Sequence, residues 1–237
     1  MRRNFSPPAA NVDVKRQIIF ITGTDTGVGK TVLASLLVRH LRAREISVAA
    51  FKPVCSGGRD DAQALHAALG GALSLDEINP WYFRAAVSPL LAAWAEKKTV
   101  MLAEVAAQAR RLQQRFPVLL VEGAGGLLSP LGEDFDSRDL IKTLRATPVV
   151  VAPNRLGAIN QVLLTLAALP RGLAKKTPVV LVSQPKPDAA GRGNFDFLIE
   201  KLGRQRVHEL PWIHPDRTTA ERRTRQTLEA LTGSLGV

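Results

Sequence analysis

The chain has 237 residues, a net charge of +11 and an apolar fraction of 46%. This length suits one sizeable domain with a substantial core. Aromatic residues make up 5% and do not alternate with the basic ones, which disfavours a stacking surface for nucleic acid. We interpret the positive charge as an aid to solubility and as an attraction for small anionic substrates.

The N-terminal region and the cysteine content predict the compartment. Residues 1–15 read as a loose polar tail without the apolar stretch of a secretory signal, and residues 16–237 read as a single domain. No apolar run is long enough to span a bilayer. Cys55 is the only cysteine, so an intrachain disulfide is excluded. We therefore expect a cytoplasmic protein that binds neither membranes nor nucleic acid.

The first strong motif is a strand, a glycine-rich loop and a helix. Residues 18–21 are apolar, residues 22–31 read Thr-Gly-Thr-Asp-Thr-Gly-Val-Gly-Lys-Thr, and a helix is expected from Lys30 to about Arg44. A phosphate-binding loop needs this order, because its backbone N–H groups and the helix N-terminus face an anion. Lys30 would reach the β- and γ-phosphates, and the Thr31 hydroxyl would ligate Mg²⁺. The competing interpretation is a helix N-cap rich in Gly and Thr.

Strands and helices are expected to alternate along the rest of the chain. Further strands are predicted at residues 47–51, 117–121, 148–152, 178–182 and 207–210. Further helices are predicted to begin near residues 60 and 88, and to cover 100–115, 137–144, 157–169, 195–202 and 216–231. Residues 52–58 and 79–83 are expected as loops, and residues 122–126 as a glycine turn. This order predicts an α/β fold of the P-loop NTPase type, with a mainly parallel sheet covered by helices on both faces.

The turns after the first three apolar strands should open onto one crevice, because ligands bind at the carboxyl ends of parallel strands. Glu122 follows five apolar residues, and a carboxylate there is costly to bury without a partner. We interpret Glu122 as a magnesium ligand, with a cap on the glycine turn as the alternative. Asp61 is a second candidate ligand. Its alternative role is a helix N-cap, and Asp60 competes for either role.

A second lysine is expected in the same crevice. Lys52 directly follows the second strand, and by itself it would be read as an exposed surface residue. With Lys30 across the crevice, Lys52 becomes a clamp on a transferring phosphoryl group or a carbamate. Ser56 would donate a hydrogen bond beside it.

Seven motifs in chain order resemble the dethiobiotin synthetase family, over about residues 17–215. The phosphate-binding loop has that family's one-residue extension, and the other motifs match its Lys-Pro-Val-x-Ser-Gly segment and its acidic glycine turn. The motifs are Gly23–Thr31, Lys52–Gly57, Asn79–Pro80, Ser88–Pro89, Val121–Gly126, Leu156–Asn160 and Glu209–Trp212.

The resemblance implies an ATP- and Mg²⁺-dependent ligase acting on 7,8-diaminononanoate and CO₂ or bicarbonate, in a step of biotin biosynthesis. One amine becomes a carbamate, ATP phosphorylates it, and the other amine displaces phosphate to close the ureido ring. The implied role of Lys30 is to stabilise the γ-phosphate, and Lys52 and Ser56 would hold the carbamate. The implied Mg²⁺ ligands are Thr31, Asp61 and Glu122.

The resemblance also implies the binding residues of a homodimer with the substrate at the subunit interface. The implied nucleotide-binding residues are Thr26, Gly27, Val28, Gly29, Lys30, Thr31, Glu122, Gly125, Ser183, Gln184, Pro211 and Trp212. The implied substrate-binding residues are Thr24, Lys52, Ser56 and, from the partner chain, Gly157, Ala158, Ile159 and Asn160. Two positions depart from the family pattern. Gly27 stands where many members have Glu, and Ser183-Gln184 replaces the common Asn-Asp, whose Asn contacts adenine.

Three other functions remain open on the sequence. A P-loop switch ATPase of the partitioning or division type is disfavoured, because the loop lacks a second, early lysine. A cobyrinate-type ligase usually carries an additional glutaminase domain, for which 237 residues leave no room. A nucleotide-binding module without catalysis would follow if Ser183 abolished useful base binding.

Overall fold

The computed structural model describes residues 15–186, 188–212 and 218–237. Its centre is a parallel sheet in the strand order β10-β9-β8-β1-β5-β2. The six strands are β1 (Gln17–Gly23), β2 (Val48–Phe51), β5 (Val118–Gly126), β8 (Thr147–Pro153), β9 (Val179–Val182) and β10 (Val207–Leu210). The strands β1, β2, β8 and β9 are almost entirely buried, which explains their apolar runs. The predicted α/β fold with a mainly parallel sheet is confirmed.

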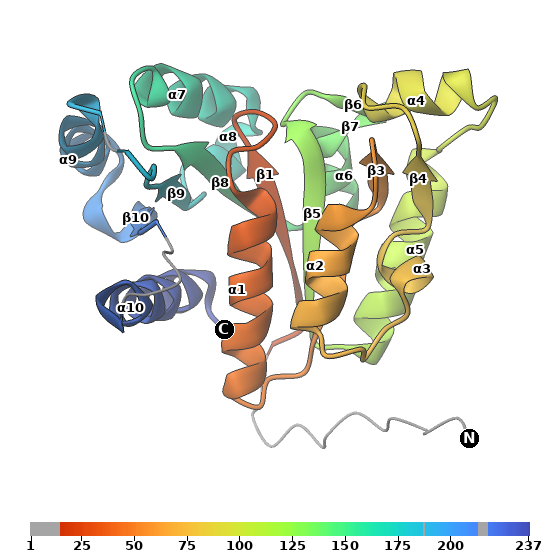
Figure 1. The fold of residues 1–237 in the computed structure, drawn as a ribbon, viewed down its shortest axis with the longest axis horizontal. Coiled ribbons are helices and arrows are strands. Elements are labelled where there is room, and N and C mark those ends of the chain that lie inside the picture. Colours follow the sequence, from red (N-terminus) through yellow and green to blue (C-terminus); the bar gives the residue numbers. More distant parts are fainter. Residues whose placement is uncertain (1–14, 187, 213–217) are drawn as a thin grey trace.

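Helices cover both faces of the sheet (Figure 1). One face carries α1 (Lys30–Ala43) between α2 (Asp60–Ala68) and α10 (Thr218–Leu235). The other face carries α5 (Leu102–Arg115) packed beside α6 (Ser137–Leu144). These helices agree with the predicted ones, although the expected start of the last helix at residue 216 lies outside the described residues.

Shorter helices complete the fold, and two of them were missed by the sequence analysis. Predicted helices appear as α4 (Pro89–Ala95), α7 (Ala158–Ala168) and α9 (Ala190–Leu202), the last beginning five residues earlier than expected. The missed helices, α3 (Leu75–Ile78) and α8 (Arg171–Ala174), are each a single turn, too short to show a helical period. A 3₁₀ turn, η1 (Arg204–Arg206), precedes β10. None of the helices described is both long and apolar enough to cross a membrane.

Two segments predicted as loops form a separate two-stranded sheet. β3 (Val54–Ser56) lies within residues 52–58 and pairs in parallel with β4 (Trp81–Phe83) within residues 79–83. The loop prediction was wrong because Pro and Gly flank three-residue strands whose pairing is non-local. A short hairpin of β6 (Pro130–Gly132) and β7 (Phe135–Asp136) was likewise not predicted.

The glycine turn expected at residues 122–126 is the last part of β5 instead. Glu122 pairs with Ile21 of β1, and Gly126 pairs with Gly23 across a register shift. Because β5 continues past its apolar run, Glu122 lies inside the sheet with 1% of its surface exposed. A carboxylate buried in this way needs hydrogen-bonding or ionic partners.

Candidate functional site

The glycine-rich loop wraps tightly between β1 and α1. Gly29 is the N-cap of α1 with φ of 100°, a left-handed conformation that favours glycine. The Lys30 ammonium folds back and donates to the carbonyl of Asp25 at 2.8 Å. A Cβ on Gly23 would lie 2.7 Å from a methyl carbon of Val28, so the loop closes over a position that only glycine fits. This requirement explains a glycine one residue earlier than the usual pattern.

Four polar side chains from different elements meet beside this loop. The Lys52 ammonium lies 2.6 Å from Oε1 of Glu122 and 2.9 Å from Oδ2 of Asp61. It also donates to the carbonyl of Gly123 at 3.0 Å. The Thr31 hydroxyl donates to the same Glu122 oxygen at 2.8 Å. The ends of β1, β2 and β5 therefore converge on one charged cluster, as the sequence predicted.

The backbone of Lys52 is fixed on both sides. Its N–H donates to the carbonyl of Ile78 at 2.8 Å, and its carbonyl accepts from the buried Asn79 side chain at 2.8 Å. Arg59 in turn holds Asn79, donating to its side-chain oxygen at 3.1 Å and to its carbonyl at 2.7 Å. The family motif Asn79–Pro80 therefore anchors the lysine without facing a ligand itself.

Burial and neighbouring charges act differently on the ionisable groups of the cluster. Burial, followed by the charge of Lys52, lowers the pKa of Lys30 to about 8. Burial would also lower the pKa of Lys52, but the carboxylates of Glu122 and Asp61 outweigh it and raise that pKa above its usual value. For Asp61, burial opposes ionisation and Lys52 overcomes it, so its pKa is lowered. The lowered pKa of Asp61 keeps its carboxylate ionised beside the positively charged Lys52.

The donor set suits a small divalent cation that completes its shell with phosphate and water. Thr31 and the two carboxylates supply oxygen atoms, which are the ligands that Mg²⁺ prefers. Oε2 of Glu122 is buried and has no hydrogen-bond partner among the described residues, a costly state that a cation would relieve. No group of three or more His, Cys, Asp or Glu with metal-site geometry occurs in the described part of the chain. The cluster alone is therefore an incomplete shell.

A hollow of about 750 Å³ opens onto the cluster. The predicted residues that line it are Thr26, Gly27, Gly29, Lys30, Thr31, Lys52, Ser56, Asp61 and Gly125. Asp60 also lines the hollow, but the ion pair with Lys52 is made by Asp61. The sequence analysis brought these residues together correctly from separate parts of the chain.

One wall of this hollow was missed. Residues 86–88, before α4, line it, and the carbonyl of Val87 accepts a 2.6 Å hydrogen bond from Ser56. Ser129 also lines it and accepts a hydrogen bond from the N–H of Gly126 at 3.0 Å. The Ser88–Pro89 motif was a usable signal, because it matches the family pattern, but the sequence analysis assigned it no place in the site.

The remaining predicted residues lie outside this hollow. Thr24 and Val28 support the loop, since the N–H of Thr24 donates to the Val151 carbonyl and Val28 is buried. Gly157 caps α7 with φ of 91°, and the helix begins with residues 158–160. Leu156 precedes this cap with 82% of its surface exposed. Within one chain, residues 157–160 do not line the hollow.

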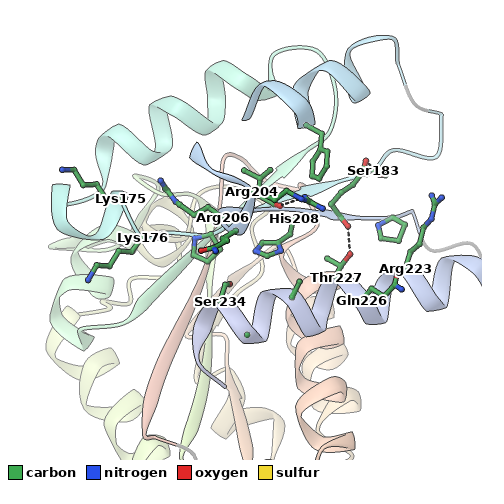
Figure 2. Close-up of a pocket in the computed structure, with 18 residues that line it drawn as sticks. Lys175, Lys176, Ser183, Arg204, Arg206, His208, Arg223, Gln226, Thr227 and Ser234 are labelled. Carbon is green, nitrogen blue, oxygen red and sulfur yellow. Dashed lines mark hydrogen bonds between the residues drawn. The ribbon is translucent and has the colours of Figure 1, made fainter. Parts of the chain in front are cut away.

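A second hollow of about 1020 Å³ lies along the edge strand β10, facing α10 (Figure 2). Figure 2 shows Lys175 and Lys176 at one end and Ser183 and Arg223 at the other, with His208 between them. The charged side chains that line it are Lys175, Lys176, Arg204, Arg206, Arg223 and Glu209. We call this hollow the β10 groove.

Ser183 and its neighbours stand where the β10 groove approaches the phosphate-binding loop. A Cβ on Gly29 would lie 3.1 Å from a methyl carbon of Val182, so the end of β9 touches the loop. The Ser183 hydroxyl donates to Oε1 of Glu209 at 3.1 Å, and Asn154 donates to the same oxygen at 3.3 Å. The other predicted residues of this region are Gln184, whose amide donates to the Val182 carbonyl, Pro211, which lines the groove, and Trp212, which is exposed.

A parallel sheet, a glycine loop that leads into a helix and a Lys-Thr pair near the buried Glu122 together define a P-loop nucleotide-binding protein. The solved structures agree in fold. The chain matches the MinC:MinD complex of Aquifex aeolicus with a TM-score of 0.55 at 14% identity, over 92% of this chain and 95% of that one. A ParA family ATPase from Chlorobium tepidum matches with a TM-score of 0.51 at 10% identity, over 94% and 92%. These identities show the fold alone.

Sequence comparison gives the family. The family model described as an AAA domain matches residues 17–218. The ATP-dependent dethiobiotin synthetase BioD of Anaeromyxobacter dehalogenans strain 2CP-C is 40% identical over 84% of this chain and 91% of its own. That of Methanococcus vannielii is 40% identical over 63% of this chain and 71% of its own. The chain belongs to the dethiobiotin synthetase family.

Proposed function

We propose that this chain is an ATP- and Mg²⁺-dependent dethiobiotin synthetase. It closes the ureido ring of dethiobiotin from 7,8-diaminononanoate and CO₂, a step of biotin biosynthesis. The observation that supports this most directly is the meeting of Lys30, Lys52, Asp61 and Glu122 at a phosphate-binding loop. A chain related to named ATP-dependent dethiobiotin synthetases would need these charges for carbamate and phosphate chemistry.

The reaction has three steps that the hollow can accommodate. One substrate amine attacks CO₂ and loses a proton, which forms a carbamate. A carbamate oxygen then attacks the γ-phosphorus of ATP, and ADP leaves. The second amine attacks the carbonyl carbon of the mixed anhydride, inorganic phosphate leaves, and the ring closes.

The side chains of the cluster take roles that follow from their charge. Lys30 stabilises the negative charge that moves with the γ-phosphoryl group. Lys52 and Ser56 hold the carbamate, because both line the hollow beside the loop. Thr31, Asp61 and Glu122 hold Mg²⁺, which neutralises the charge of the phosphates when it is bound. Thr26, Gly27, Val28 and Gly29 of the loop, together with Gly125 of β5, surround the triphosphate.

The base of the nucleotide is proposed to lie where β9 and β10 end. Ser183, Gln184, Pro211 and Trp212 follow these strands, and β9 touches the phosphate-binding loop. The Ser183 hydroxyl proton is directed to Glu209, so its oxygen can act only as an acceptor toward a base. Ser183 should therefore recognise adenine less strongly than the Asn that is common at this position.

A homodimer would complete the substrate site. Residues 157–160 begin α7 outside the hollow, and their backbone N–H groups suit a carboxylate such as that of diaminononanoate. The exposed Leu156 and Leu164, with 82% and 63% of their surfaces accessible, give α7 an apolar surface for a partner. Thr24, at the base of the loop, is proposed to contact the substrate from the same chain as Lys52 and Ser56.

Product detection tests the proposed function. The chain is incubated with 7,8-diaminononanoate, bicarbonate and ATP, and the cyclic urea is sought by mass spectrometry. We expect product and phosphate release only when both the diamine and bicarbonate are present. Equal ATP hydrolysis with neither present, and no cyclic urea, would contradict the proposal and favour a switch ATPase.

A further inference from the structure

The Lys52 ammonium occupies the space between the two carboxylates that are the proposed metal ligands. It lies 2.6 Å from Glu122 and 2.9 Å from Asp61, and 2% of the side-chain surface of Lys52 is exposed. The Glu122 oxygen that it contacts is the one that also accepts from Thr31. The ammonium therefore already uses oxygen atoms from two of the three residues in the proposed metal shell.

An ammonium and a divalent cation compete at this carboxylate pair. Even if the metal binds the unpartnered Oε2 of Glu122 while the ammonium contacts Oε1, the two like charges lie close together and repel. A divalent ion carries twice the charge and prefers carboxylate oxygen, so it has the advantage once phosphates supply further ligands. Binding of the metal then requires the ammonium of Lys52 to leave.

The surroundings of Lys52 allow its side chain, but not its backbone, to move. The backbone is held at Ile78 and Asn79, as described above. The side chain borders the 750 Å³ hollow, which Ser56 and Val87 also line. A displaced ammonium would therefore enter the space proposed for the carbamate.

We propose that Lys52 and the divalent metal exchange at the Asp61–Glu122 pair, so that metal loading releases the Lys52 ammonium toward the substrate. Without metal, the single ammonium is shared between the two carboxylates. With metal, the same ammonium becomes available to a carbamate. The inference rests on the proposed function for the metal assignment.

The exchange makes metal and carbamate binding mutually reinforcing. By thermodynamic linkage, any anion that draws the ammonium away from the carboxylates must raise their metal affinity by the same factor. The Lys52 ammonium would then be available to the carbamate only when the metal is in place. Phosphoryl transfer would therefore be slow in a site that lacks the metal.

Mn²⁺ binding without nucleotide tests the exchange. Free Mn²⁺ is titrated by electron paramagnetic resonance against the wild-type chain, Lys52→Met and Lys52→Arg. We expect Lys52→Met to bind Mn²⁺ at least about fivefold more tightly than wild type, at the low end of common couplings between ligands. Lys52→Arg keeps the competing charge and should bind close to the wild type. Lys98→Met removes an exposed lysine paired with Glu96 and is the matched control.

A second measurement guards against poor folding of Lys52→Met. Lys52→Gln retains a hydrogen-bond donor without the charge, and Mn²⁺ should raise its unfolding temperature more than that of wild type. Equal or weaker Mn²⁺ binding by both neutral variants would overturn the exchange, even if wild type makes dethiobiotin. No Mn²⁺ binding by any variant would overturn it too. The proposed function is decided separately by whether wild type forms the cyclic urea.

Discussion

The basic side chains of the two hollows differ in their burial and in the carboxylates near them. At the phosphate-binding loop, Lys30 and Lys52 are buried and face two carboxylates. In the β10 groove, Lys175, Lys176, Arg204 and Arg223 are exposed, and Glu209 is the one carboxylate among its described lining residues. Water can solvate an exposed charge, whereas a buried one needs a partner.

The difference indicates that the hollow at the phosphate-binding loop is the one arranged for chemistry. The buried cluster holds each charge through contacts of 2.6–3.0 Å, so its geometry exists before any ligand arrives. The exposed side chains of the groove are long and have no comparable constraint from carboxylates. We expect variants at the loop to change rate and metal binding strongly, and variants near the groove to have small effects.

The largest effect is expected for Lys52→Ala. The turnover number should fall about 10²–10³-fold, because the variant loses a charge that acts on the carbamate and the transition state. The dissociation constant for ATP should change little, since Lys30 remains. Steady-state kinetics and nucleotide titration measure both, with thermal unfolding to verify the fold. An unchanged turnover number would remove Lys52 from the site.

Glu122→Gln should weaken the Mg²⁺ response by at least about tenfold. The amide keeps the size of the side chain but removes the charge that a divalent ion requires, and losses of 10–100-fold follow even from changes around metal ligands. A magnesium titration of activity gives the result, with Glu104→Gln, an exposed residue of α5 outside both hollows, as the matched control. A magnesium titration identical to wild type would refute the assignment of Glu122.

ATP affinity should fall as the pH rises above 8. The pKa of Lys30 is about 8 without ligand, so below that pH the lysine is already charged when ATP arrives. Above it, binding must take up a proton, and affinity should fall by up to roughly tenfold per pH unit. Calorimetry in two buffers at pH 8.5 measures the proton uptake. Lys30→Met should remove both effects, and uptake that persists in this variant would assign the proton elsewhere.

Base selection should be weak. With the Ser183 proton directed to Glu209, we expect ATP, CTP and GTP to differ in affinity by no more than about tenfold, roughly the value of one hydrogen bond. Ser183→Asn should increase the preference for ATP. Competitive binding of the three nucleotides tests this. A strong preference of the wild type for ATP would show that other groups read adenine.

The smallest effect is expected in the groove, at His208. Burial, aided by the charge of Arg204, lowers its pKa below the usual value, and its Nε2 has no partner among the described residues. As the pH falls below 6.5, His208 therefore binds a proton in the unfolded chain before it does so in the folded chain. Stability present above pH 6.5 is lost as the pH falls toward the folded pKa. Urea unfolding of His208→Gln should show a smaller loss between pH 6.5 and 5, whereas His66→Gln should resemble wild type.

Local patterns were enough to identify much of this protein. The order of strand, glycine loop and helix at residues 17–43 uses neighbouring residues only, and the structure follows it closely. Apolar runs were enough to predict the central strands, because a strand covered on both faces of a parallel sheet is apolar on both sides. The chemistry-bearing residues Lys30, Lys52 and Glu122 followed from their places at strand ends.

Non-local contacts decided the rest. Lys52 and Glu122 are 70 positions apart, and their 2.6 Å contact depends on β2 pairing with β5. The position of the ammonium between two carboxylates, the wall at residues 86–88 and the β10 groove likewise depend on which elements pack together. Sequence patterns report which face of an element is buried, while strand order and packing determine what that face meets. The physical reason is that side-chain period is a local property, whereas the distance between two elements is set by the whole fold.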